Sequence, residues 1–369
     1  MPDLFIGLMS GTSLDGVDGV IADFSGARLT VLQHASEPFD PALKSELLAL
    51  NRPGNNELHR AALAANALAR RYAAVVQRLL ERCGVQAGRV AAIGAHGQTV
   101  RHRPGEFDGT GYTLQLNQPA LLAELTGIRV VCDFRSRDVA AGGQGAPLVP
   151  AFHREVFGRL GASMAVLNIG GIANLSVLAA NGKVTGFDCG PGNGLMDHWC
   201  QAHMGQAFDE DGSWAATGKV SRELLAQFLC ERYFSLPPPK STGRDLFHAD
   251  WLSRHLSRCS NTSPADVQAT LAELTASAIV QALFSYGKDS EKLIVCGGGA
   301  LNGHLMGRIA ALLPSVPVES STSHGLPPLQ VEAAAFAWLA REALAERAVD
   351  LAAVTGALGN RVLGAIYPP

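Results

Sequence analysis

The most informative stretch of this sequence for its fold is Met9-Ser10-Gly11-Thr12-Ser13-Leu14-Asp15-Gly16-Val17-Asp18. The runs on either side of it, Leu4–Met9 and Val17–Phe24, are apolar and rich in β-branched residues, so we expect two strands joined by a glycine-containing turn. The two glycines permit tight geometry and close backbone approach, and the Thr and Ser supply hydroxyl and amide groups that suit a phosphate. The stretch therefore predicts an anion-binding turn between strands.

The acidic residue of this turn, Asp15, is a candidate for orienting a magnesium ion, because magnesium prefers oxygen ligands and keeps much of its water. The alternative is an ordinary hairpin whose Asp and Ser satisfy their own turn. If the turn binds phosphate, the candidate residues are Gly11, Thr12, Ser13, Leu14, Asp15, Gly16, Val17 and Asp18.

A second turn repeats this arrangement without a carboxylate: Leu167-Asn168-Ile169-Gly170-Gly171-Ile172-Ala173-Asn174. The pattern of strand, glycine turn and strand at 4–24 thus recurs at 164–178. Two such turns, one in each of two related domains, would clamp a polyphosphate from both sides. A plain hairpin is the alternative.

A third turn follows a predicted strand and leads into a predicted helix: Gly297-Gly298-Gly299-Ala300-Leu301-Asn302. Three residues without side chains leave room for a base or sugar against the backbone, and a helix N-terminus adds partial positive charge. The alternative is a sharp turn with no ligand. No Walker loop and no G-x-G-x-x-G fingerprint follows the first strand, which disfavours the P-loop and Rossmann folds.

Strand-like and helix-like segments are mixed along the whole chain, which predicts an α/β protein. Apolar runs bounded by glycine predict strands at 4–9, 17–24, 89–93, 112–116, 128–132, 164–169, 173–178, 183–187 and 292–296. Apolar residues at intervals of three and four predict helices at about 57–83, 147–158, 264–286 and 329–346.

The length and composition predict two domains. The chain has 369 residues, 47% hydrophobic and 17% charged, and domains usually span about 100–200 residues. We place the first domain at 1–135 and the second at 136–346, with 347–369 as a segment that returns to the first. The proline-rich break at 236–240 is then a loop inside the second domain.

Charge and cysteine usage limit the class of partner. Thirty basic and 33 acidic residues give a formal net charge of -3, without the clustered Lys and Arg typical of nucleic-acid or anionic-membrane binding. The seven cysteines are scattered and form no C-x-x-C pair, as expected for thiols in a reducing cytosol. We see no signal sequence and no uncharged run of the roughly 20 residues that span a membrane. We expect a cytoplasmic protein with a small ligand.

A candidate general base lies in Gly186-Phe187-Asp188-Cys189-Gly190-Pro191-Gly192-Asn193. We expect Asp188 at the end of a strand, followed by a Gly/Pro turn and a helix capped by Asn193. The helix N-terminus would help to keep Asp188 ionised, as a base must be. The alternative is that Asp188 only satisfies amides of the turn.

Loops dense in polar side chains follow the later strands of the first half, at 94–102, 133–138 and 142–147. They suit a hydroxylated ligand whose acid group meets Arg135 or Arg137. His96 and His102 are six residues apart, so they do not make the H-x-x-x-H pair of a helical metal site, and either is equally well a satisfied loop histidine.

Two further features have polar character near predicted apolar elements. The run Lys240-Ser241-Thr242-Gly243-Arg244 is a candidate phosphate-facing loop, with a solvated turn as the alternative. Glu332 is an acid within an apolar helix and faces either a polar cleft or solvent.

Taken together, these motifs resemble those of the anhydro-N-acetylmuramic acid kinases, a family of the actin-like ATPase superfamily. The resemblance runs in order along nearly the whole chain, and its most specific parts are the stretch 7–18 and the run from Asp133 to Pro147. It implies two actin-like, ribonuclease H-like domains that flank a nucleotide and substrate cleft, a homodimer, and a role in recycling peptidoglycan fragments in the cytoplasm.

The resemblance also implies the reaction and the residues that perform it. ATP with magnesium converts 1,6-anhydro-N-acetylmuramic acid and water into N-acetylmuramic acid 6-phosphate and ADP, and Asp188 activates the water. Besides the residues of the first turn, it implies nucleotide contacts at Gly170, Gly171, Asn174, Gly190, Gly192, Gly297, Gly298, Gly299 and Asn302. It implies substrate contacts at His96, Gln98, Arg135, Asp138 and Glu332.

Two rival functions share this fold. One is a conventional sugar or acyl kinase that phosphorylates a free hydroxyl or carboxylate. The other is a nucleotide-switched binding protein of the actin or heat-shock-chaperone kind, which would hydrolyse ATP without phosphorylating a sugar. From the sequence we expect no appended peptide-binding domain that would favour the second.

Overall fold

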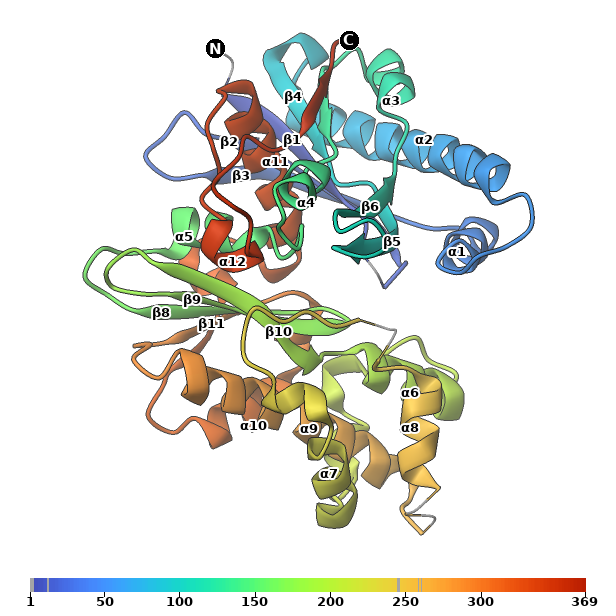
Figure 1. Cartoon of the computed structure of the whole chain (residues 1–369), viewed down its shortest axis with the longest axis vertical. Coiled ribbons are helices and arrows are strands. Elements are labelled where there is room, and N and C mark those ends of the chain that lie inside the picture. The colour runs from blue at the N-terminus through green and yellow to red at the C-terminus, as the bar shows by residue number, and fades with distance from the viewer. Residues whose placement is uncertain (1–2, 12, 244–245, 258, 260) are drawn as a thin grey trace. The chain divides into compact units, whose positions relative to one another are not determined.

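The computed structural model of this chain describes residues 3–11, 13–243, 246–257, 259 and 261–369. The chain forms two compact units, one made of Met1–Phe152 with Leu329–Pro369 and the other of His153–Pro328. Figure 1 shows that each unit combines a sheet with helices. The predicted α/β class is thereby confirmed.

The first unit contains a six-stranded sheet of order β13-β7-β4-β1-β2-β3 and a two-stranded ribbon of β5 and β6. Its strands are β1 (Leu4–Met9), β2 (Gly16–Asp23), β3 (Thr30–Pro38), β4 (Val90–Ala95), β5 (Gln98–Pro104), β6 (Gly111–Leu116), β7 (Val130–Cys132) and β13 (Ala365–Tyr367). Its helices are α1 (Pro41–Ala49), α2 (Glu57–Cys83), α3 (Pro119–Thr126), α4 (Ser136–Ala140), α11 (Val331–Leu344) and α12 (Ala352–Thr355).

The second unit contains a five-stranded sheet of order β10-β9-β8-β11-β12. Its strands are β8 (Met164–Ile169), β9 (Ile172–Leu178), β10 (Val184–Pro191), β11 (Leu293–Cys296) and β12 (Val318–Ser320). Its helices are α6 (Gly194–Met204), α7 (Arg222–Leu229), α8 (Ala249–Leu256), α9 (Pro264–Tyr286) and α10 (Gly303–Leu312). Helix α5 (Val149–Phe157) contains the point at which the two units divide.

The two sheets share one plan. In the first, β1–β2 and β2–β3 are antiparallel while β1–β4 and β4–β7 are parallel. In the second, β8–β9 and β9–β10 are antiparallel while β8–β11 and β11–β12 are parallel. The repeat predicted at 4–24 and 164–178 is therefore the start of the same five-strand arrangement in both units, as expected of two related actin-like domains.

The units divide at 152/153 and 328/329, whereas the sequence predicts boundaries at 135/136 and 346/347. Helix α11 belongs to the first unit because it packs against β1 and β4. Its approach is close, since a Cβ on Gly7 would lie 1.8 Å from the carbonyl oxygen of Ala333 and one on Gly94 would lie 2.0 Å from that of Phe336. Two glycines thus let the helix backbone lie directly on the sheet.

Helix α2 covers the opposite face of the same sheet. Side chains alternate between faces along a strand, and Ile6 and Leu8 of β1 join a buried cluster with Leu68 and Tyr72 of α2. Gly7, between them, faces α11. The sheet of the first unit therefore carries a helix on each face.

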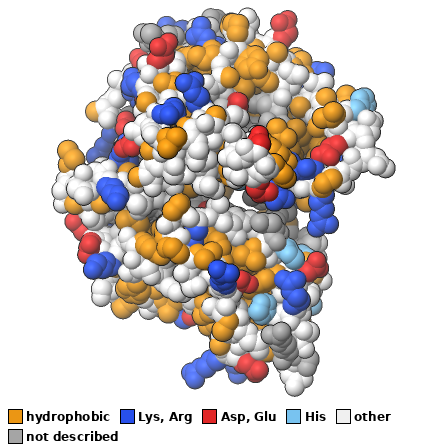
Figure 2. Space-filling view, in the orientation of Figure 1, with side chains coloured by type: hydrophobic (Ala, Val, Ile, Leu, Met, Phe, Trp, Pro, Cys, Tyr) orange, Lys and Arg blue, Asp and Glu red, His pale blue; other side chains and the backbone are white. Residues whose placement is uncertain are grey.

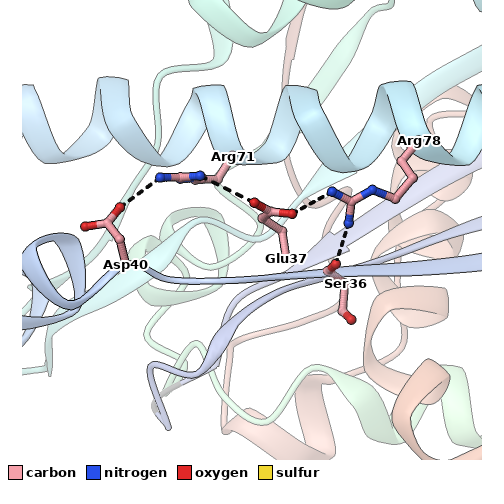
Figure 3. A network of polar contacts seen from close by, with 5 residues as sticks. All are labelled: Ser36, Glu37, Asp40, Arg71 and Arg78. Atoms are coloured by element: carbon pink, nitrogen blue, oxygen red, sulfur yellow. Dashed lines mark hydrogen bonds and ion pairs between the residues drawn. The ribbon is translucent and has the colours of Figure 1, made fainter.

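A chain of ion pairs fixes α2 to the end of β3, as Figure 3 shows. Glu37 accepts from Arg71 at 3.4 Å and from Arg78 at 2.7 Å, and Arg71 also pairs with Asp40 at 2.9 Å. Arg78 donates in addition to the carbonyl oxygen of Ser36 at 2.8 Å. Because each partner is half-exposed, we regard this network as setting geometry more than stability.

Helix α9 forms the centre of the second unit. Its length and mean hydropathy of 1.3 would suit a membrane span, but 83% of its most apolar window is buried inside the structure. It packs on β9, β10, α6, α7 and α10. Its apolar composition is therefore accounted for by core packing.

Candidate functional site

The turn between β1 and β2 has one side chain buried beneath it. Leu14 adopts a φ of 58° and is only 3% exposed, and its amide donates to the carbonyl of Gly11 at 3.2 Å. Val17 is also in the core, so both residues offer only main chain to a ligand. Ser13 is half-buried beside Gly11, and Thr12 lies outside the described residues.

The two acids of this turn differ in their surroundings. Asp18 lies on β2 with its Oδ1 3.2 Å from Nε2 of His34. The side chain of Asp15 is 76% exposed and pairs with Lys44 at 3.3 Å. The main chain of Asp15 is fixed, because its carbonyl oxygen accepts from the amide of Phe39 at 3.1 Å.

The residues around Asp15 fit a magnesium ion only when a nucleotide supplies most of the ligands of that ion. Within the described residues no three His, Cys, Asp or Glu side chains gather as they would in a site made by protein alone. Magnesium on a nucleotide takes most of its ligands from phosphates and water and needs one or two carboxylates. An exposed Asp15 whose carbonyl oxygen is hydrogen-bonded satisfies that requirement.

The predicted glycines fall into two groups according to what a Cβ would meet. At Gly16, Gly192, Gly297 and Gly299 a Cβ would lie 2.3–2.4 Å from other protein atoms, and Gly190, with a φ of 152°, would strike the ring of Phe234 at 2.6 Å. At Gly11, Gly170, Gly171 and Gly298 the nearest atom is at 3.6 Å or beyond, and none of the four has a positive φ. The first group is required by the fold. The second group lacks side chains where the protein itself has room for them, as a backbone that contacts a ligand would.

Asn193 joins the glycine turns of the second unit to one another. Its amide donates to the carbonyl of Gly170 at 2.8 Å, and its Nδ2 donates to that of Ile169 at 3.3 Å. A Cβ on Gly298 or Gly299 would lie 3.6 Å or 3.1 Å from its side chain. Its predicted role as a side-chain cap of α6 is wrong, because the side chain makes no capping bond and is used in this junction.

A polar row crosses the second sheet. Directly opposed residues on adjacent strands place Asn168 of β8 beside Asn174 of β9, and Asn174 beside Asp188 of β10. Opposed residues point to the same face. The Oδ1 atom of Asn174 is buried and has no hydrogen-bond partner among the described residues, so it is an acceptor that a bound donor would satisfy.

Asp188 lies inside β10, at an irregularity in the register, and not at the strand end that the sequence predicts. Its Oδ2 accepts from the amide of Thr242 at 2.9 Å. Its carbonyl oxygen accepts from the hydroxyl of Tyr233 at 2.8 Å, and its amide donates to the carbonyl of Lys240 at 3.2 Å. Strand β10 and the loop 240–242 therefore orient the carboxylate together.

Lys240 contributes a positive charge near Asp188. Its Nζ donates to the carbonyl of Tyr233 at 3.2 Å and lies 4.7 Å from the centre of that ring. Burial lowers the pKa of Lys240, against the opposing effects of Cys189 and Asp188. Arg244, the last residue of the predicted phosphate-facing loop, lies outside the described residues.

In the first unit the predicted sugar loop and the phosphate turn form one hydrogen-bonded assembly. Nε2 of Gln98 donates to the carbonyl of Gly11 at 3.1 Å, while its Oε1 is buried with no partner among the described residues. The hydroxyl of Tyr72 meets Ser10 Oγ at 3.0 Å and accepts from the amide of Gly97 at 3.1 Å. Because Ser10 Oγ donates to the carbonyl of Gly97 at 3.0 Å, the proton between the two hydroxyls comes from Tyr72.

His96 is held as a neutral ring. Its Nε2 accepts from Arg135 Nη2 at 2.9 Å, so the ring proton lies on Nδ1, 3.3 Å from the carbonyl oxygen of Ser10. Burial, reinforced by the charge of Arg135, lowers the pKa of His96 to about 3. The ring lies 4.7 Å from that of Phe336 on α11.

Comparison with known proteins decides the family. The family model described as anhydro-N-acetylmuramic acid kinase matches residues 3–369. A relative of that name from Variovorax paradoxus is 65% identical, over 99% of this chain and 99% of its own length. Another, from Albidiferax ferrireducens, is 62% identical and the match covers 100% of both chains.

This chain belongs to the anhydro-N-acetylmuramic acid kinase family. Membership confirms the resemblance drawn from the motifs and the kinase class that it implies. Among solved structures, component A of the (R)-2-hydroxyglutaryl-CoA dehydratase of Acidaminococcus fermentans matches 90% of this chain and 96% of its own, with 11% identity and a TM-score of 0.49. That likeness is too low to decide either fold or ligand.

Two predicted residues of this family member have mainly internal partners. Asn302 caps α10, since its Oδ1 accepts from the amide of Leu305 at 2.9 Å. Asp138 is 3% exposed and both of its oxygens accept hydrogen bonds from within the first unit. Glu332 is half-buried in the first turn of α11.

Sequence reasoning missed Tyr72, Asn168 and Asn193 as parts of this kinase's candidate site. Tyr72 lies in a helix and carries no local motif, so only its complete burial together with its hydroxyl bonds reveals it. Asn168 lies in the second predicted glycine turn, and the signal for its role is its position opposite Asn174 in the hairpin register.

Proposed function

We propose that this chain is an ATP-dependent kinase that opens the 1,6-anhydro ring of 1,6-anhydro-N-acetylmuramic acid and phosphorylates O6. The products are N-acetylmuramic acid 6-phosphate and ADP, and the reaction serves the recycling of peptidoglycan fragments. Family membership supports the reaction, and the orientation of Asp188 within a polar row of the second sheet is the structural observation that carries it.

Asp188 acts as the general base. A water molecule beside the carboxylate gives up a proton to it while the water oxygen bonds to C1 of the sugar and the C1–O6 bond breaks. The amide of Thr242 and the backbone contacts of residue 188 hold the carboxylate in one orientation, as a positioned base requires.

The oxygen released from C1 then takes the phosphoryl group. O6 is an ether oxygen in the substrate and becomes a nucleophile only as its bond to C1 breaks, so ring opening and phosphoryl transfer are coupled. O6 bonds to the γ-phosphorus and ADP leaves. Catalysis of such a transfer depends on positioning and charge stabilisation.

The glycine turns supply much of that positioning. We assign nucleotide contacts to the open backbone at Gly11, Gly170, Gly171 and Gly298, where a side chain would fit the protein but would obstruct a phosphate or base. Magnesium, when bound, would neutralise charge on the phosphates, and we assign to Asp15 the role of orienting it.

The sugar contacts are assigned to the first unit. We assign to Arg135 the positive charge that meets the acid group of the sugar, and the neutral His96 beside it adds no charge of its own. The unsatisfied Oε1 of Gln98 would accept from a sugar hydroxyl or amide.

The test is a product assay with ATP, magnesium and 1,6-anhydro-N-acetylmuramic acid in ¹⁸O-labelled water, quenched early. We expect one labelled oxygen at C1 and none in the transferred phosphoryl group. A control sample of unlabelled product in the same water measures slow exchange at C1. Phosphorylation of open N-acetylmuramic acid alone would indicate a conventional kinase, and ATP hydrolysis without sugar phosphate would indicate a nucleotide-switched binding protein.

We propose further that the enzyme acts as a homodimer in the cytoplasm, with a small sugar as its partner and without nucleic acid or a membrane. The seven cysteines are free thiols. On the face seen in Figure 2, acidic and basic side chains are interspersed, in keeping with a net charge of -3. Light scattering after size-exclusion chromatography would measure the oligomeric state.

A further inference from the structure

A relay of buried and partly buried hydrogen bonds links Thr355 of α12 to Arg135. The first link is Gly145, whose carbonyl oxygen accepts from Arg135 Nη1 at 2.8 Å. The other side of the guanidinium donates to His96 at 2.9 Å. The position of Gly145 therefore sets where the charge of Arg135 lies relative to His96.

The second link is Asp138. Its Oδ2 accepts from the amide of Gly145 at 2.7 Å, and Gly145 has a φ of 67° that suits glycine. In the part of the chain that the structure describes, Asp138 forms no ion pair, although it is a buried carboxylate. Such a group needs hydrogen-bond donors to both oxygens.

The third link comes from α12, far away in the sequence. Thr355 Oγ1 lies 2.8 Å from Asp138 Oδ1 and 3.2 Å from the carbonyl oxygen of Leu351. One hydroxyl proton serves one acceptor best, and the nearer, charged carboxylate is the stronger acceptor. Thr355 is 1% exposed, so water does not replace this donor.

Main-chain bonds hold α12 against the same loop. The amide of Gln144 donates to the carbonyl of Thr355 at 2.8 Å, and the amide of Leu358 donates to that of Ala141 at 2.9 Å. A Cβ on Gly143 would lie 2.2 Å from Asp138 Oδ2 and 2.9 Å from the Cβ of Ala357. The loop 138–145 and the segment 355–358 thus pack without spare room.

We propose that Thr355 and Asp138 are positioning residues for sugar binding, which act through Gly145 to hold the guanidinium of Arg135 against His96. This assignment rests on the proposed function, in which Arg135 meets the acid group of the sugar. It replaces the predicted direct contact between Asp138 and the substrate. Neither residue is a catalytic residue, because neither touches the reacting atoms.

The test compares Thr355→Val, which removes the hydroxyl and keeps the branched shape, with Thr355→Ser, which keeps the hydroxyl. We expect Thr355→Val to raise the KM for the anhydro sugar by about tenfold, the effect of losing one hydrogen bond to a charged group, while the KM for ATP changes by less than about twofold. Thr355→Ser should restore the sugar KM.

A control and a second readout separate positioning from folding. Val354 is buried in the same short helix and makes no bond in the relay, so Val354→Ala should lower the melting temperature without changing the sugar KM. Histidine NMR should show the pKa of His96 rising in Thr355→Val, because Arg135 no longer lies against Nε2. If Thr355→Val does not fold, Asp138→Asn replaces it in both measurements, because this substitution removes one of the two acceptor oxygens of Asp138.

The outcomes divide clearly. An unchanged sugar KM and an unchanged His96 in Thr355→Val, with the same loss of melting temperature as in Val354→Ala, would overturn the relay. If the wild-type enzyme fails to phosphorylate the anhydro sugar, the proposed function fails instead. The NMR comparison then still decides whether Thr355 holds Arg135 in place.

Discussion

In the first unit the turn between the first two strands is long and holds Asp15, whereas in the second unit the equivalent turn is only Gly170-Gly171 and holds no acid. The third strands of the two arrangements, β3 and β10, also differ in what their acidic residues contact. Strand β3 ends at the ion pairs of Glu37 and Asp40 that hold α2, while β10 carries Asp188 in its polar row. One strand plan thus carries a charged group at different positions in its two copies.

The difference indicates a division of labour between the two copies. An acid on an exposed turn can reach a metal ion on a phosphate, and an acid within a strand is held in a fixed direction, as a base must be. In the proposed function, the short turn of the second copy offers only backbone to the nucleotide. Substitutions at these positions should therefore fail in different ways.

Loss of the strand acid should have the largest effect. We expect Asp188→Asn to lower turnover by at least about a hundredfold, because the substitution removes the proposed general base and keeps the shape of the side chain. Binding of ATP, measured by calorimetry, should stay close to the wild-type value. Near-normal turnover would show that residue 188 is not the base.

Two glycines of the second unit separate folding from ligand binding. Gly192→Ala would place a Cβ 2.3 Å from the carbonyl oxygen of Gly170, and overpacking against backbone costs about 1–3 kcal/mol of unfolding free energy. Gly171→Ala meets nothing within 4 Å, so it should keep or raise stability by up to about 1 kcal/mol. It should nevertheless weaken ATP binding.

Urea unfolding and ATP titration of both variants measure this contrast. If the Gly171→Ala variant binds ATP like the wild type, the nucleotide contact assigned to Gly171 is wrong. Equal losses of stability in the two variants would contradict the distinction between glycines required by the fold and glycines left open for a ligand.

The elements that the sequence predicts well are those whose burial follows a simple period. The helices at 57–83 and 264–286 and the strands Leu4–Met9 and Met164–Ile169 are confirmed at those bounds. The edge strand β3 was missed because only Ala35 in it is fully buried and its side chains do not alternate between apolar and polar. Strand β13 was missed for the same reason, since all three of its residues are exposed.

The site is predictable only as far as its local motifs reach. The glycine turns and Asp188 stand out in the sequence, but the link from Thr355 to Asp138 joins residues 217 positions apart, and no spacing rule signals it. The role of Asn193 was mistaken because a cap and a bridge between turns call for the same residue type. Whether the side chain of Asn193 caps the helix or bridges the turns depends on tertiary packing, which a short stretch of sequence does not encode.

Loss of the turn acid should have a smaller effect than loss of the strand acid. We expect Asp15→Asn to raise the KM for magnesium-ATP by about tenfold, since one charged ligand contact is removed while phosphates and water still hold the ion. Lys44→Met is the matched control, because it removes the ion-pair partner of Asp15 and leaves the carboxylate. The KM for magnesium-ATP is measured for both variants across a range of magnesium concentrations. Equal changes in KM in Asp15→Asn and Lys44→Met would show that the ion pair of Asp15 and Lys44 is only a surface contact.

The smallest effect concerns one buried histidine in each unit. Burial lowers the pKa of His153 to about 3, as burial and Arg135 do for His96. The unfolded chain, with histidine near 6.5, binds more protons between these values, so the free energy of unfolding falls as the pH drops below about 6.5. From pH 6 to pH 5 each histidine should remove about 1 kcal/mol.

Replacing the histidine of the second unit isolates its share of this loss. His153→Leu has no proton to bind, so its unfolding free energy should fall by about 1 kcal/mol less than that of the wild type over the same pH step, whatever its stability at pH 7. His59→Leu, at an exposed position, is the control for removing a histidine. Urea unfolding of the three proteins at both pH values gives one difference in unfolding free energy for each protein. A wild-type loss that persists in His153→Leu would assign the acid sensitivity to the first unit, where His96 is held against Arg135 by the relay from Thr355.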